Sequence, residues 1–194
     1  VIVYLFESYS VLSNFIIISS IFFIFSSIKD TIKLFKNKDF NFSRIVSHTA
    51  FGFLVLFIGL NYNFSLEKDF NLKVGETKKF DNYSIKFKDL NLKVFKNYKA
   101  VIGEFKILNL RNNSEQSLTP EIRIYENPST LTYEASIRTG LLKDYYITMS
   151  NIDRSDYYNI KFQKKPFMLW IWISVIIISL GGFLRLFKNG NKNY

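Results

Sequence analysis

The chain has 194 residues, a formal net charge of +10, 48% hydrophobic and 18% aromatic residues, which allows at most one ordinary domain plus membrane anchors. The hydrophobic content is high for a soluble protein, but a mean hydropathy of +0.05 is too low for a membrane bundle without a soluble part. The sequence lacks cysteine, which excludes disulfides and thiol chemistry. Its positive charge accompanies an over-use of Lys, Asn, Ile, Phe and Tyr, which indicates a codon-composition bias, so we expect no nucleic acid partner.

Three apolar segments predict transmembrane helices. The first two, Val11–Ile28 and Ile45–Phe64, contain no Asp, Glu, Lys or Arg, and each is long enough to cross the hydrocarbon of a bilayer. The third, Pro166–Phe183, begins with a proline that suits the first turn of a helix and carries Trp170 and Trp172 where interfacial aromatic residues are common. A buried helix in a soluble protein would rarely be so uniformly apolar.

The short segments that flank these spans are basic, which predicts their side of the membrane. Lys and Arg resist translocation, so the segments 29–44 and 188–194 are expected on the cytoplasmic or matrix side. The long segment between the second and third spans is then on the outer side. The predicted division is a first span with its lead-in (1–28), a basic cytoplasmic loop (29–44), a second helix with His48 (45–64), an extracytoplasmic domain (65–165), a third helix (166–187) and a cytoplasmic tail (188–194).

Inside 65–165 the apolar period changes from helical to two, which is typical of half-buried β-strands. Turn residues separate the apolar stretches at 75–76, 112–114 and 127–129. The predicted strands are 70–74, 83–88, 101–108, 121–125, 133–138, 145–149 and 157–162, with 111–116 as a hairpin tip. Many short strands without a convincing helix indicate an all-β domain, either a small barrel or a sandwich.

His48 is the only histidine of the sequence, and it lies inside the second predicted span. Ionisable groups inside a membrane usually face the protein interior and have a function. An imidazole there could be an axial ligand of haem iron or a proton relay. It could equally be an interfacial side chain that hydrogen-bonds water or lipid head groups, because its position is near the edge of the span.

Small residues surround His48 in the sequence and recur in the third span. They would let a neighbouring helix or a flat macrocycle approach the backbone closely, and ordinary helix packing is the commoner reason for them. The small residues are Ser47, Thr49, Ala50, Gly52, Gly59, Gly181 and Gly182.

Signatures of a self-contained enzyme are missing from the sequence. It contains no glycine-rich phosphate loop, no paired-histidine metal motif and no serine with a second histidine for nucleophilic catalysis. Glu121, Glu126 and Glu134 fall on predicted strands or turns, and we expect them to be solvated surface charges.

Several stretches match a known family in their order and spacing along the chain. They are Ser43–Gly52 with Gly59, Val74–Glu76, Leu118–Tyr125, Thr132–Ile137 with Asp144–Tyr146, and Lys165–Phe167 with Trp170, Trp172, Gly181 and Gly182. Over about residues 43 to 187, the chain resembles the C-terminal part of CcmF, the haem lyase of the cytochrome c maturation pathway.

The resemblance implies that His48 is one of two transmembrane axial ligands of a resident haem b. The second ligand would come from the N-terminal part of the lyase. This chain would then be either a split-gene product or a fragment of a longer parent, and lyase activity is expected only together with the N-terminal part. The implied partners are the haem chaperone CcmE, a CcmH-type subunit that handles the apocytochrome, apocytochrome c itself and membrane lipid. The implied location is the inner membrane of a bacterium or of a mitochondrion, with the β-domain on the periplasmic or intermembrane-space side.

Two other functions compete with the haem lyase at this stage. The chain could be a membrane-anchored scaffold whose β-domain binds an assembly partner, with His48 incidental. A transporter fragment is less compatible with the sequence, because three spans with a single ionisable side chain offer little polar lining for a transport pathway.

Overall fold

The computed structural model describes residues 11–36, 42–152 and 155–190. The chain divides into two compact units, each considered by itself. One contains the helices together with residues 140–143, and the other contains residues 66–139 and 144–164. The predicted lead-in before residue 11, and parts of the predicted loop and tail, lie outside the described residues.

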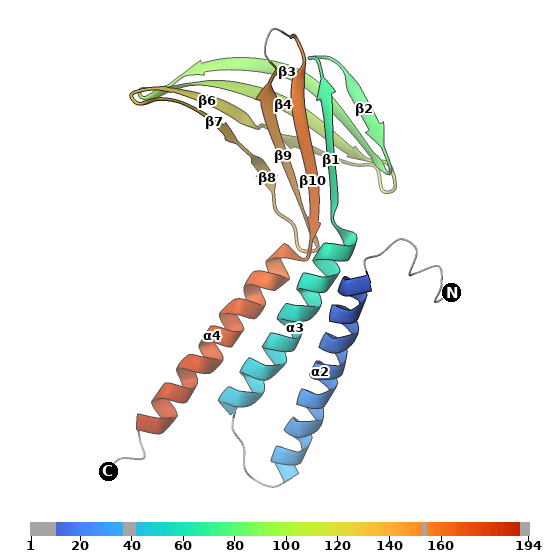
Figure 1. The fold of residues 1–194 in the computed structure, drawn as a ribbon, viewed down its shortest axis with the longest axis vertical. Helices are drawn as coiled ribbons and strands as arrows, with labels where there is room; N and C mark the ends of the chain where they lie inside the picture. Colours follow the sequence, from blue (N-terminus) through green and yellow to red (C-terminus); the bar gives the residue numbers. More distant parts are fainter. Residues whose placement is uncertain (1–10, 37–41, 153–154, 191–194) are drawn as a thin grey trace. The chain divides into compact units, whose positions relative to one another are not determined.

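The helical unit consists of α2 (Val11–Lys36), α3 (Phe42–Phe64) and α4 (Met168–Gly190), with α3 between the other two (Figure 1). All three are long and apolar enough to cross a membrane, with mean hydropathies of 2.1, 1.6 and 2.0 over their spans. Large apolar side chains point outward, as lipid-facing side chains do; Phe22 is 75% exposed. The three predicted membrane helices are thereby confirmed.

The helices extend beyond the predicted spans at the basic ends. α2 continues past Ile28 to Lys36, and α3 begins at Phe42, before Ile45, so much of the predicted 29–44 loop is helical. The physical reason is that hydropathy marks the membrane boundary, whereas helical hydrogen bonding continues through residues such as Lys and Leu, which favour helix.

Glycines mark the closest approaches between helices. A Cβ atom added at Gly59 would lie 2.9 Å from Ile17 Cγ1 of α2, and one added at Gly52 would lie 2.6 Å from Ile24 Cγ1. On the other side of α3, the Ser43 hydroxyl donates a hydrogen bond of 2.5 Å to the carbonyl of Gly181 in α4. Helix packing therefore accounts for the glycines of α3 and for Gly181.

The β-unit contains a four-stranded sheet in the order β1-β10-β9-β8 and a six-stranded sheet in the order β2-β3-β4-β6-β7, with β5 also paired to β4. Their strands are β1 (Leu66–Leu72), β2 (Thr77–Phe80), β3 (Tyr83–Val94), β4 (Tyr98–Asn109), β5 (Ser114–Leu118), β6 (Glu121–Glu126), β7 (Ser129–Glu134), β8 (Ser136–Arg138), β9 (Lys143–Asn151) and β10 (Tyr158–Pro166). The predicted all-β domain is a sandwich.

The core of the sandwich contains residues from both sheets. The six-stranded sheet contributes Ile85, Phe87 and Phe105, and the four-stranded sheet contributes Ile147 and Phe162, each at most 1% exposed. The rings of Phe87 and Phe105 stack with their centroids 4.4 Å apart. Alternate side chains of each inward-facing strand therefore build one continuous apolar layer.

The strand predictions need four corrections. Strands β2 and β5 were not predicted, because they consist mainly of Thr, Lys, Ser, Glu and Gln, and part of β5 occupies the predicted hairpin tip. The predicted strand 133–138 is interrupted at Ala135, where the chain leaves the six-stranded sheet and enters the four-stranded one. The first strand is 66–72 rather than 70–74, since Gly75, with φ of +90°, belongs to a turn that begins before it.

Candidate functional site

His48 lies in the first half of α3, and its side chain is exposed on the surface of the helical unit. The imidazole stacks against the ring of Phe23 in α2, with the centroids 6.1 Å apart and the planes 10° from parallel. Phe23 is itself held edge-on by Phe51 of α3 at 5.7 Å. Two aromatic rings from two helices thus define the plane of the imidazole.

This stacking leaves the ring nitrogens of His48 accessible. The lone pair with which an imidazole binds a metal lies in the plane of the ring, so a partner stacked on the face does not block it. The residue is exposed, and a ligand could therefore approach from outside the helical unit. The arrangement suits an imidazole that binds a group held between this chain and another one.

A pocket of about 150 Å³ adjoins His48. It is lined by residues from α2 and α3, namely Ser27, Asp30, Thr31, Arg44, Ile45 and His48. Arg44 precedes His48 by four residues, so the two side chains lie on the same face of α3, one turn apart. The pocket thus combines an imidazole, a guanidinium and a carboxylate at the end of a membrane helix.

The donor set allows one bond to a haem iron but not a complete site. In the part of the chain that the structure describes, no three or more His, Cys, Asp or Glu side chains lie together in a way that could hold a metal ion. The pocket is also smaller than the roughly 300–1,000 Å³ of ordinary ligand sites. His48 therefore fits one axial position of a macrocycle that lies largely outside this chain.

Sequence reasoning found His48 but missed its neighbours. Arg44 could have been found from its spacing to His48, whereas Phe23 and Asp30 are brought to the site by the packing of α2 on α3. Of the two adjacent glycines singled out in α4, Gly181 contacts α3, and Gly182 has nothing within 4 Å of an added Cβ. The Trp170 indole donates a hydrogen bond of 2.8 Å to the Leu141 carbonyl, within the helical unit.

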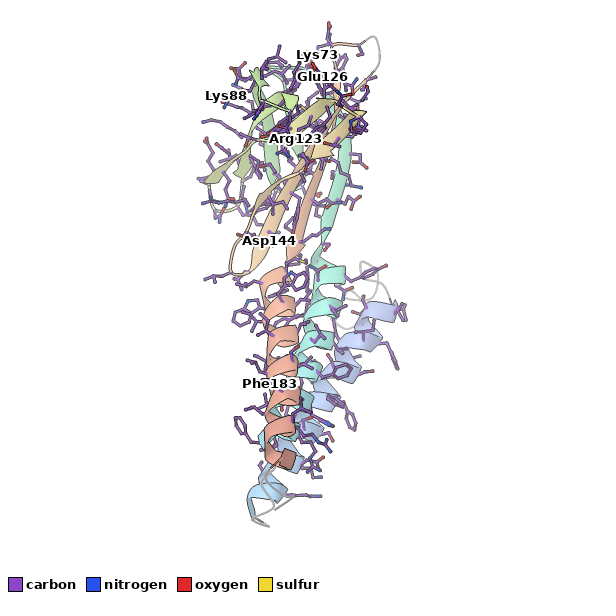
Figure 2. The ribbon with its side chains drawn as sticks, turned by 90° about the vertical axis from the view of Figure 1, so that its left-hand side faces the viewer. Lys73, Lys88, Arg123, Glu126, Asp144 and Phe183 are labelled. Atoms are coloured by element: carbon purple, nitrogen blue, oxygen red, sulfur yellow. The ribbon has the colours of Figure 1, made fainter. Side chains whose placement is uncertain are left out.

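The glutamates singled out in the sequence, Glu121, Glu126 and Glu134, are half-buried or exposed in the β-unit and have local partners. The Arg123 guanidinium pairs with Glu121 at 2.8 Å, and Lys99 pairs with Glu126 at 2.9 Å; Arg123 and Glu126 are labelled in Figure 2. Lys99 lowers the pKa of Glu126 by hydrogen bonding and charge, and Glu134 accepts a hydrogen bond from Thr132. All three carboxylates have local partners.

The six-stranded sheet carries an exposed apolar surface, which we call the apolar strip. In the strand register, Leu92, Val101 and Tyr133 share a row with the core residue Ile122, and Val94, Ile124 and Leu131 occupy the next row outward, together with Lys99. Leu92 and Val94 are each 78% exposed. The core face of this sheet therefore continues uncovered where the hairpins β3–β4 and β6–β7 reach past the four-stranded sheet (Figure 1).

Comparison with known proteins relates this chain to one family. Residues 63–166 match the family described as "CcmF C-terminal beta-sandwich". The chain is 31% identical over 144 residues to the cytochrome c-type biogenesis protein CcmF of Haemophilus influenzae, covering 74% of this chain and 22% of that protein. It is 24% identical over 143 residues to CcmF of Escherichia coli, with 74% and 22% covered.

A solved structure shares the fold. A cytochrome c haem lyase CcmF superposes with a TM-score of 0.56 at 17% sequence identity, covering 72% of this chain and 23% of that one. The chain thus spans between a fifth and a quarter of the length of the relatives that it matches. Together with the three membrane helices and the sandwich, these matches show that the chain belongs to the CcmF family and corresponds to its C-terminal part.

Proposed function

We propose that this chain is the C-terminal segment of a membrane haem lyase that attaches haem to apocytochrome c, and that His48 is one axial ligand of a resident haem b. The remainder of the lyase would supply the second ligand. The observation that carries the proposal is the exposed His48 on a membrane helix, with its imidazole stacked on Phe23. A bound haem would supply an iron centre that can carry one electron.

The residues around His48 support a ligand role better than an incidental one. An imidazole that only hydrogen-bonds water needs no fixed ring plane, whereas an axial ligand binds through one nitrogen and is oriented through its surroundings. Phe23 provides that orientation, and the apolar residues of α3 that follow His48 continue into the membrane span.

The proposed topology places the His48 end of α3 and the sandwich on opposite sides of the membrane. Basic residues before α3 favour the cytoplasmic or matrix side for that end, and the chain order then puts the sandwich in the periplasm or the intermembrane space. There it could meet the haem chaperone CcmE, a CcmH-type subunit and the apocytochrome. The membrane would be the bacterial or mitochondrial inner membrane.

The test is haem content in the assembled complex. The chain is co-expressed with the N-terminal part of a CcmF-type lyase, purified in detergent and assayed for b-type haem by its reduced absorption spectrum. We expect His48→Ala to lose the haem and His48→Gly to recover it when imidazole is added to the buffer. Thr49→Ala, the next residue of α3, is the matched control and should retain haem. Full haem occupancy in the His48→Ala complex would refute the ligand role.

A second candidate function is a scaffold whose β-unit binds an assembly partner, and the apolar strip favours it. We propose that the occupant of the strip is the remainder of a CcmF-type protein, since the chain spans only 22% of such a protein. Buried apolar surface is the main driving force of stable association, and an uncovered patch of this kind marks an interaction surface.

Charge substitutions on the two faces of β3 test the scaffold function. Leu92→Asp with Val94→Asp should abolish co-purification of the N-terminal part, because a carboxylate would be buried without a partner. Asn91→Asp, which adds charge on the opposite face of the same strand, should leave it intact. Equal co-purification by both variants would exclude the strip as the contact.

A further inference from the structure

We infer that the pocket beside His48 is a carboxylate-binding site in which Arg44 holds a propionate of the macrocycle that His48 ligates. The inference rests on the proposed function, and it assigns to Arg44 the role of a positioning residue. It follows from the placement of Arg44, from the chemistry of its side chain and from the charge balance of the pocket.

The placement is set by α3. Arg44 and His48 lie one helical turn apart on one face and line the same pocket, with about 6 Å between them along the helix axis at 1.5 Å per residue. A haem has its iron at the centre of the macrocycle and both carboxylates at one edge. A cation one turn from the axial ligand is therefore placed to reach that edge.

The direction along the helix also fits an amphipathic ligand. Arg44 precedes the apolar stretch 45–64, where the span meets the interface, and the residues after His48 lead into the span. A haem bound here would place its apolar edges toward the membrane interior and its carboxylates toward the interface, where charged groups retain access to water. The opposite orientation would bury two carboxylates in hydrocarbon.

The chemistry of the guanidinium suits this ligand. Arginine stays charged at any physiological pH and offers five N–H donors in a planar fork, which binds carboxylates in pairs of hydrogen bonds. Such a side chain can serve two carboxylates at once. Lysine would keep the charge but lose the paired geometry.

Asp30 gives the inference its sharpest consequence. Its carboxylate lines the same pocket from α2, so it opposes the approach of a second carboxylate while Arg44 favours it. Neutralising Arg44 and neutralising Asp30 should therefore act in opposite directions on the same ligand. Both charges would also act on the iron, since a nearby positive charge favours the ferrous state and a nearby negative charge favours the ferric state.

The experiment uses the co-expressed complex and two readouts besides activity, the rate of haem transfer to apomyoglobin and the midpoint potential of the bound haem. For Arg44→Ala we expect about ten- to a hundred-fold faster haem loss, as for a lost charge-assisted hydrogen bond, and a lower potential. Arg44→Lys should recover part of the retention. Asp30→Asn should slow haem loss and raise the potential.

Two controls test whether the effect of Arg44 on haem retention depends on a propionate carboxylate. Lys29→Ala removes the same charge from α2 at a residue that does not line this pocket, and it should leave haem retention unchanged. The second control replaces haem by its dimethyl ester, which lacks the propionate charges. The ester should dissociate from the unsubstituted complex as fast as haem dissociates from the Arg44→Ala complex. The Arg44→Ala substitution should not increase the dissociation rate of the ester.

The outcomes separate this inference from the proposed function. If His48→Ala loses its haem but Arg44→Ala retains haem and potential, the carboxylate site is wrong and the ligand role stands. If the ester binds the unsubstituted complex as tightly as haem does, the guanidinium holds something else, such as a lipid phosphate, and the inference is overturned even where Arg44→Ala fails to assemble. If His48→Ala keeps its haem, both proposals fall together.

Discussion

The contact between α3 and α4 provides a direct test of how helix packing positions His48. A Cβ added at Gly181 would meet Ser47 Oγ and would lie 3.2 Å from Ser47 N and 3.3 Å from Ser43 O. A side chain can rotate away, but the backbone atoms of α3 cannot. The substitution Gly181→Ala should therefore push the helices apart and break the hydrogen bond from Ser43 to the Gly181 carbonyl.

Comparison with the neighbouring Gly182 gives the expected change in unfolding free energy for Gly181→Ala. Alanine is favoured over glycine inside a helix by about 1 kcal/mol at either position, so Gly182→Ala, which meets nothing within 4 Å, should be neutral or slightly stabilising. Overpacking costs about 1–3 kcal/mol, and it applies only to Gly181→Ala. The two variants should therefore differ in unfolding free energy by about 1–3 kcal/mol, with Gly181→Ala the less stable.

The assay is equilibrium unfolding of the purified complex in detergent micelles, followed by helical circular dichroism, with haem occupancy measured on the same samples. Because Ser47 immediately precedes His48, the displaced helix should also lower haem occupancy in Gly181→Ala. Equal stability and equal occupancy in the two variants would refute the reasoning, since the only difference between them is the contact with α3.

Two further predictions concern the β-unit. Phe87→Ala removes a fully buried ring stacked on Phe105 and should destabilise the sandwich by about 3–5 kcal/mol in denaturant titrations, whereas Leu131→Ala on the exposed strip should cost far less; comparable losses would contradict the assignment of the core. Burial, followed by a hydrogen bond with Tyr145, raises the pKa of Tyr83. The stabilising contribution of Tyr83 should therefore be complete below the ordinary tyrosine pKa of about 10 and be lost as the pH rises further. The free energy of unfolding should fall in alkali, and the fall should be smaller in Tyr83→Phe. An unchanged alkaline profile in Tyr83→Phe would contradict it.

The sequence alone was sufficient for the elements whose signal is local. The three membrane helices follow from runs of uncharged residues, because transfer of each apolar side chain into lipid is favourable whatever the rest of the fold does. The all-β domain follows from alternation and turn residues over 65–165, whereas the choice between a barrel and a sandwich came from the pairing of the strands. His48 could be singled out because an imidazole is rare inside such a span.

Strands that depend on a neighbour for stability were not predictable in the same way. β2 and β5 are short and polar, and they form because β3 and β4 offer hydrogen-bonding edges to them. The interruption at Ala135 was also missed, since alternation persists on both sides of it while the chain changes sheets. Local composition carries no information about which strand lies alongside.

The tertiary structure alone decided what surrounds His48 and what remains uncovered on the sandwich. Phe23 stacks on His48 and Asp30 lines the pocket because close contacts at Gly52 and Gly59 fix the rotation of α2 against α3. The apolar strip exists because β3 and β4, with 12 residues each, outreach the nine-residue strands of the other sheet. A period of two identifies the inward face of a strand, but only the length and position of the opposing sheet determine whether that face is covered.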